Sequence, residues 1–389
     1  MTVRDLDQAL ATARELFDDL SCAHARRWKA EDANRRVIGY LPIYIPREIL
    51  HALDMLPVGI FGAGARLPVV HGDAFFQSYI CHLPRTVVDL AMGGHMDHYD
   101  GFLFPAICDV IRNLSGIFRL NFKDKFVRYV DFPQNFDPQV GGAFYRRELE
   151  RLAAGLGQLN GRSLDVGAVN RSIGLYNRNR ELVTALAEFR STQPHKISAV
   201  DYYLVLRAGY IMPVEEYNSY LAEMLDMLAA VQTEREDKIR VVITGAFCEQ
   251  PPLGLIKTIE NAGCYIVDDD FQLGARWIQG DIVADTDDPL GALVDAYLFQ
   301  SVPSSAVYAD NGRKATALAA AVRDQAADGV IFCAPSFCDP ALLDRPLLEK
   351  ALDREDIRHF NFQYHENLGQ FHVIKEQAGT FADTIKLWA

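Results

Sequence analysis

Two stretches of this chain alternate short apolar segments with helix-like patterns, and this alternation restricts the possible folds more than any other feature. Most of the apolar segments end at proline, glycine or aspartate, which is typical of buried strands. Strands that alternate with helices predict parallel, doubly wound sheets, so we expect an α/β protein with two Rossmann- or flavodoxin-like lobes. The predicted strands are 37–46, 58–64, 100–105 and 126–133 in the first lobe, and 239–245, 264–270, 329–334 and 357–363 in the second.

A long segment with helical period separates the two stretches. From Ala143 to about Glu236 the apolar residues recur at helical spacing throughout, which predicts a helical insert. We therefore expect three units: residues 1–140, an N-terminal helix and the first α/β lobe; residues 141–236, a helical domain; and residues 237–389, the second lobe. The N-terminal helix is predicted around Leu6 to Leu20, and we expect it to pack on the outside of the first lobe.

The overall composition excludes several classes of protein. At 389 residues, with 49% hydrophobic and 23% charged side chains, the chain is long enough for more than one hydrophobic core. A net charge of −13 argues against nucleic acid or an anionic membrane as the main partner. The N-terminal segment is too acidic for a signal peptide, and no run of 18 apolar residues occurs. We expect a cytoplasmic enzyme.

Three cysteines occupy similar places in this pattern. Cys81, Cys108 and Cys338 each lie in a predicted strand-to-helix loop, where an open α/β sheet forms its crevice. The amide groups at a helix start favour a thiolate or an anionic cluster. Soft sulfur ligands favour iron–sulfur or zinc. We therefore predict that these three thiolates hold one [4Fe–4S] cluster, with the fourth iron open to water, substrate or another ligand.

The other cysteines offer fewer arguments for a function. Cys248 follows a predicted strand and is an alternative ligand, because its loop could reach the same crevice. Cys333 lies on a predicted strand, and Cys22 and Cys264 lie in helix and strand patterns, so we expect these three to fill space in the core. Taken singly, an unpaired cysteine in apolar surroundings is usually such a filler. No C-x-x-C pair and no G-x-x-x-x-G-K-[ST] motif occurs, which argues against a zinc ribbon and a P-loop.

Beyond these patterns, the sequence resembles the family of 2-hydroxyacyl-CoA dehydratase and benzoyl-CoA reductase subunits over nearly its whole length. The segments SYICHLPRT and FPAICDVIRNL resemble the first two cluster-cysteine segments of the family, and SFCDPALLDRPLLEKAL resembles the third. Gly39-Tyr40 with Pro46 and Glu48 resembles the opening strand and helix, and LYNRNREL resembles the helical domain. Within the family, the residues around Cys81 and Cys108 are most similar to the smaller catalytic subunits of ATP-dependent benzoyl-CoA reductases.

This resemblance implies a function and a set of partners. It implies a [4Fe–4S] cluster on Cys81, Cys108 and Cys338, and reduction of benzoyl-CoA or a close analogue to a cyclohexadiene-carbonyl-CoA. It also implies a homologous second catalytic subunit, ATP-hydrolysing iron–sulfur activator subunits, and a ferredoxin as the upstream electron donor. His82, next to Cys81, is a candidate proton donor for the ring. Cys248 departs from the family, whose members commonly carry small residues and proline there.

Two other functions share the same features. A 2-hydroxyacyl-CoA dehydratase subunit would use the same fold and cysteines to remove water, with one electron recycled in each turnover. A subunit without catalytic activity, used for metal storage or as a scaffold, would hold no redox-active cluster and bind no acyl-CoA.

Overall fold

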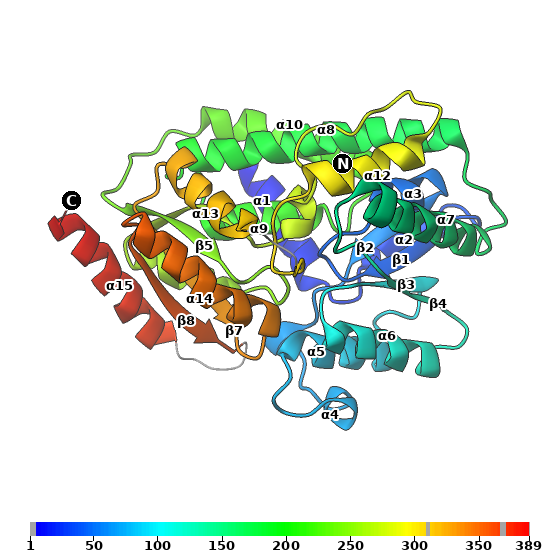
Figure 1. The fold of residues 1–389 in the computed structure, drawn as a ribbon, viewed down its shortest axis with the longest axis horizontal. Coiled ribbons are helices and arrows are strands. Elements are labelled where there is room, and N and C mark those ends of the chain that lie inside the picture. Colours follow the sequence, from blue (N-terminus) through cyan, green and yellow to red (C-terminus); the bar gives the residue numbers. More distant parts are fainter. Residues whose placement is uncertain (1–4, 309–311, 366–370, 389) are drawn as a thin grey trace.

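The computed structural model describes residues 5–308, 312–365 and 371–388 and contains two four-stranded parallel sheets (Figure 1). The first sheet has the order β2-β1-β3-β4 and the second β6-β5-β7-β8. Both orders place the second strand, the first, the third and the fourth of a lobe side by side, which is the flavodoxin-like arrangement. The two predicted α/β lobes are confirmed. The strands are β1 Arg36–Tyr40, β2 Met55–Gly59, β3 Gly101–Pro105, β4 Phe126–Val130, β5 Ile239–Thr244, β6 Cys264–Asp269, β7 Gly329–Pro335 and β8 His359–Tyr364.

Helices cover both sheets and connect them. The long helices α8 and α10 run along one side of the molecule, and α8 contacts elements of both lobes (Figure 1). The helices are α1 Leu6–Asp18, α2 Ala23–Ala30, α3 Arg47–Ala52, α4 Gly72–Phe75, α5 His82–Met92, α6 Asp109–Asn121, α7 Ala143–Gly157, α8 Val166–Thr192, α9 Ala199–Ala208, α10 Val214–Ala230, α11 Leu253–Asn261, α12 Pro289–Gln300, α13 Arg313–Asp324, α14 Asp339–Arg354 and α15 Phe371–Trp388. Among the described residues, no helix is both long enough and apolar enough to cross a membrane.

The N-terminal helix does not pack where the sequence pattern suggested. Ala9 and Ala13 of α1 are fully buried in a core shared with α9, α10 and the second lobe, and the Tyr220 hydroxyl donates a hydrogen bond to the Ala9 carbonyl at 3.0 Å. Only the end of the helix contacts the first lobe, where Arg66 donates to the Phe17 carbonyl. The expected packing on the outside of the first lobe is wrong for the body of α1, because its small residues fit closely against the helical insert.

One segment between β6 and β7 crosses back to the other lobe. Trp277, Ile278 and the apolar face of α12 are buried in the core of the first lobe, together with α7. In particular, the Tyr297 ring lies 4.7 Å from that of Tyr145 of α7, measured between ring centroids. This return holds the lobes together and leaves the carboxyl ends of the two sheets near each other.

The third strands of the two sheets end in the same way. β3 is followed by Pro105-Ala-Ile-Cys108-Asp and β7 by Pro335-Ser-Phe-Cys338-Asp, and in both cases the cysteine is the residue before a helix. The residue after each proline donates its backbone N–H to the last residue of the neighbouring fourth strand, at 2.9 Å and 2.8 Å. This matching geometry supports the interpretation that the lobes are distant copies of one fold.

Candidate functional site

Each of the three cysteines predicted as ligands lies at the N-terminal end of a helix. Cys81 precedes α5, Cys108 precedes α6 and Cys338 precedes α14. The positive end of each helix dipole therefore points towards a sulfur. Cys81 and Cys338 are buried and Cys108 is half-buried. Helix starts of this kind stabilise a thiolate, or an anionic group that the thiolate binds.

The four cysteines that follow strands lie close to one another. Burial raises the pKa of the Cys81 thiol well above its usual value, and negative charge on Glu249, Cys338 and Cys108 raises it further. Burial likewise raises the pKa of Cys248, and charge on Cys338, Cys108 and Cys81 adds to the effect. The structure thus brings together Cys81, Cys108 and Cys338 from both lobes, and it adds Cys248 to the same group.

The sulfur atoms receive backbone hydrogen bonds that oppose the effect of burial. Burial raises the pKa of Cys108, and the N–H groups of Ile111 and Val110 lower it by donating to the sulfur. Burial raises the pKa of Cys338 to about 12, against a similar bond from Ala341. Bare thiolates are therefore disfavoured here, whereas a bound metal centre would supply the positive charge that thiolates need.

The arrangement is not that of a site for a single ion. Among the described residues, no three Cys, His, Asp or Glu side chains are grouped to hold one metal ion. A [4Fe–4S] cube makes a different demand, because each thiolate binds a different iron and the ligands surround the cube instead of meeting at one point. Four buried thiols from two lobes, with helix starts behind three of them, suit such a cube.

A buried carboxyl group joins the two lobes at this site. Glu249, next to Cys248, is 4% exposed, and its Oε2 accepts a hydrogen bond from the backbone N–H of Leu83 at 2.9 Å. Leu83 lies in the first turn of α5, where amide groups have no partner within the helix. Glu249 of the second lobe thus caps the helix that follows Cys81 of the first lobe.

Two tyrosines connect the cysteine loops further. The Tyr364 hydroxyl donates to the Glu249 carbonyl at 2.6 Å, and its own carbonyl accepts from Ser336 at 2.8 Å, two residues before Cys338. The Tyr308 hydroxyl donates to the carbonyl of Ile107 at 3.3 Å, immediately before Cys108. Sequence reasoning missed Glu249 and both tyrosines. The position of Glu249 beside a loop cysteine was the one available signal for it.

The backbone is strained next to one of the cysteines. Phe337 has a φ of 65°, in the left-handed region that bulky residues rarely adopt, and it directly precedes Cys338. Its side chain is 44% exposed. Strain of this kind concentrates at functional sites, where the surrounding structure holds it in place.

The remaining candidates lie outside the group. Cys264 and Cys333 are fully buried in the second core, as expected for fillers. Cys22 is partly exposed and precedes α2 with a left-handed backbone, so it does not lie within a helix as its pattern suggested. His82 is half-buried and is the first residue of α5, beside Cys81. Its role as a proton donor stays a prediction.

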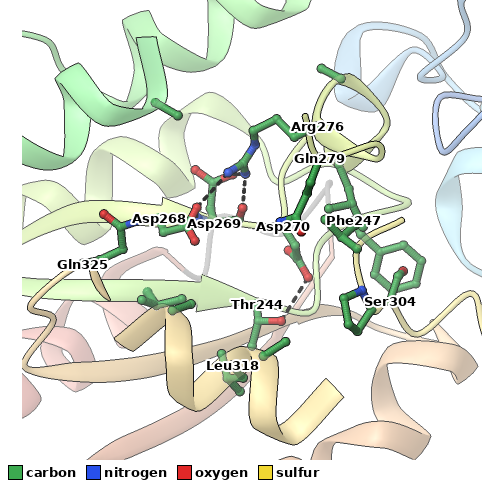
Figure 2. Close-up of a pocket in the computed structure, with 18 of the residues that line it drawn as sticks. Thr244, Phe247, Asp268, Asp269, Asp270, Arg276, Gln279, Ser304, Leu318 and Gln325 are labelled. Atoms are coloured by element: carbon green, nitrogen blue, oxygen red, sulfur yellow. Dashed lines mark hydrogen bonds and ion pairs between the residues drawn. The ribbon is translucent and has the colours of Figure 1, made fainter. Parts of the chain in front are cut away.

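A pocket of about 480 Å³ opens beside the Cys248 loop at the carboxyl ends of β5 and β6 (Figure 2). Phe247 lies in its wall, next to Cys248. The charged groups drawn in the pocket are paired: Arg276 donates to Asp268 at 2.8 Å, and Asp270 accepts from the Thr244 hydroxyl at 3.1 Å. A pocket whose charges are already paired suits a weakly polar group better than a phosphate. Its size is that of ordinary small-molecule sites.

Comparison with known proteins identifies the family. The family model described as 2-hydroxyglutaryl-CoA dehydratase, D-component, matches residues 42–385. The chain belongs to this family. It is 49% identical to the C-type subunit of benzoyl-CoA reductase of Thauera aromatica over 98% of each chain. It is also 27% identical to the beta subunit of (R)-2-hydroxyglutaryl-CoA dehydratase of Acidaminococcus fermentans, over 92% of this chain and 94% of that one.

A third member of the family extends the range of named activities. The chain is 25% identical to the beta subunit of lactoyl-CoA dehydratase of Anaerotignum propionicum over 98% of this chain and 97% of that one. Each of these relatives is named as a subunit of a reductase or dehydratase. The family resemblance predicted from the sequence is confirmed, and the chain is a subunit of an enzyme of this kind.

Proposed function

We propose that this chain is the C-type subunit of a benzoyl-CoA reductase, which adds two electrons and two protons to the ring of an aromatic acyl-CoA and yields a cyclohexadiene-carbonyl-CoA. The observation that carries the proposal is the junction of four buried cysteines in a chain 49% identical to the C-type subunit of such an enzyme. An aromatic ring resists accepting electrons, so the enzyme needs a strongly reducing centre held away from water.

The cofactor in this proposal is a [4Fe–4S] cluster held by Cys81, Cys108 and Cys338. A cluster in such surroundings supplies low-potential electron transfer. The protein's own contribution is to bind and shield it. The helix starts of α5, α6 and α14 offset negative charge, and apolar residues of the first core enclose the Cys248 and Cys338 loops.

The partners in this proposal are a homologous second catalytic subunit, ATP-hydrolysing iron–sulfur activator subunits and a ferredoxin that reduces them. Exposed aromatic side chains next to the cysteine loops offer a surface for such contacts. Tyr79 is 62% exposed two residues before Cys81, Phe337 is 44% exposed, and Tyr308 is 64% exposed above the Cys108 loop. Aromatic residues are enriched where proteins bind each other.

The test begins with the purified complex. We expect anaerobic co-expression with the second subunit to give about four irons and four sulfides for this chain, with an EPR signal on reduction. Replacing Cys81, Cys108 or Cys338 with serine should remove the cluster and the reduction of benzoyl-CoA. Cys333→Ser, a change at a buried cysteine outside the group, is the matched control and should keep both. An iron-free wild-type complex would refute the cofactor assignment.

A second candidate function has the support of two relatives. The chain is similar to beta subunits of dehydratases at 27% and 25% identity. Electron accounting separates the candidates: reduction consumes electrons in proportion to product, whereas radical dehydration needs only a catalytic amount. Loss of water from a 2-hydroxyacyl-CoA with no net electron use would favour the dehydratase.

A further inference from the structure

We infer that Cys248 is the fourth thiolate of the cluster, so that every iron in this subunit is bound by a cysteine and none is open to substrate. The inference rests on the proposed function, because it concerns the cluster proposed there. It replaces the expectation of an open fourth iron.

The grouping of the sulfurs is the first argument. Cys248 interacts electrostatically with Cys81, Cys108 and Cys338, and those three also interact with one another. Four thiols that all lie within range of each other match the number of irons in a cube. Cys333, five positions before Cys338, lies on β7, and the charge that acts on it is that of Asp270 instead.

The loop around Cys248 is built to hold one position. The buried Gln250 side chain folds back, and its Nε2 donates to the carbonyls of Ala246 and Phe247 at 3.2 and 3.1 Å. Its Oε1 accepts from the backbone N–H of Gln272 at 3.0 Å. These bonds fix the backbone on both sides of Cys248, as ligand loops require.

The loop is also anchored at its two ends. At its start, the buried Asp270 carboxylate accepts from the backbone N–H groups of Gly245 and Ala246 at 2.6 and 3.0 Å. At its end, Glu249 reaches across to Leu83 of the first lobe. The loop therefore closes against the Cys81 side of the junction, and Cys248 lies between the anchors. A filler cysteine needs no such support.

A cluster with four cysteine ligands has a different task from one with three. Because no iron coordination position is free, the thioester carbonyl of the substrate must be bound by other groups, in this chain or in its partner. The cluster of this subunit then serves as an electron relay.

Exogenous ligands test this inference on the holoenzyme complex. We would add cyanide to the anaerobically reduced complex and record the EPR spectrum, then treat a second sample with ferricyanide and count the irons. The wild-type signal should not change with cyanide, and the cluster should keep its four irons. Cys248→Ser should bind cyanide, with a changed EPR signal, and convert readily to a three-iron form, because a serine ligand is lost more easily. Cys333→Ser should behave as wild type.

The results separate this inference from the proposal on which it rests. A wild-type cluster that binds cyanide or loses one iron as readily as Cys248→Ser has an open iron, and this overturns the fourth-ligand assignment while leaving the function intact. A wild-type complex without any cluster overturns both. Should Cys248→Ser fail to assemble, the wild-type response to cyanide alone still decides the question.

Discussion

The hydrogen bond between Glu249 and Leu83 gives a direct test of how the two lobes are held at the cysteine junction. Replacing Glu249 with alanine removes the acceptor and leaves the Leu83 amide, an unsatisfied group of the first turn of α5, without its partner at 2.9 Å. The side chain is 4% exposed, so water cannot easily take its place.

The size of the effect follows from the kind of bond that is lost. Loss of a helix cap costs about 0.5–2 kcal/mol, and loss of a bond to a buried carboxyl group lies at or above the upper end of that range. We expect Glu249→Ala to destabilise the start of α5 by about 2 kcal/mol, which corresponds to roughly 30-fold faster amide exchange there. Glu249→Gln keeps an acceptor oxygen and should cost about half as much.

Hydrogen exchange followed by mass spectrometry of the anaerobic complex measures this directly at the peptide that spans Leu83. Glu260→Ala is a matched control, because Glu260 accepts from the Ala199 amide at the start of α9 at 2.8 Å, far from the cysteines in sequence. The control should speed exchange at α9 and leave α5 unchanged. Wild-type exchange at α5 in Glu249→Ala would refute the claim that this carboxyl group caps the helix.

Three further changes test other parts of the structure. Arg190→Met leaves the buried partner Asp269 uncompensated and should lower the free energy of unfolding by about 3–5 kcal/mol, seen as a lower urea midpoint; a midpoint within error of wild type would contradict this. Gly274→Ala forces a Cβ against the Ile43 carbonyl oxygen of the first lobe and should cost about 1–3 kcal/mol, whereas Gly116→Ala in open space on α6 should stabilise by up to ~1 kcal/mol; a Gly274 variant as stable as the Gly116 variant would show that the lobes yield freely. Burial raises the pKa of Asp270 from 3.8 to about 6, so between these values the folded chain holds a proton that the unfolded chain has released, and stability falls as the pH rises; Asp270→Asn should flatten the fall of the melting temperature across this pH window, and an unchanged slope would rule this group out as its source.

The local pattern of the sequence was enough to predict most of the elements near the site. All eight predicted strands are present, because each is a short apolar run that ends at a residue unfavourable for a strand. Their ends were less certain: the first predicted strand was 37–46, whereas β1 ends at Tyr40 and Pro46 instead precedes α3. The placement of Cys81, Cys108 and Cys338 before helices also followed from the pattern.

The polar residues of the second lobe could not be predicted in this way. Asp268 and Asp269 looked like a solvated strand end, but Arg276 and the buried Arg190 pair with them. Arg190 lies on α8, in the helical insert, so no spacing along the chain indicates the pair. The pocket that these groups line was equally invisible in the sequence.

Alternation of apolar runs and helix patterns determined the fold class, and the loop position of the cysteines limited what they could do, because both depend on neighbours along the chain. Tertiary structure alone decided that α12 returns to the first core, that Glu249 caps a helix of the other lobe and that Cys248 joins the other three thiols. These contacts join residues far apart in sequence, and they arise only when two separately formed sheets pack and bury their shared surface.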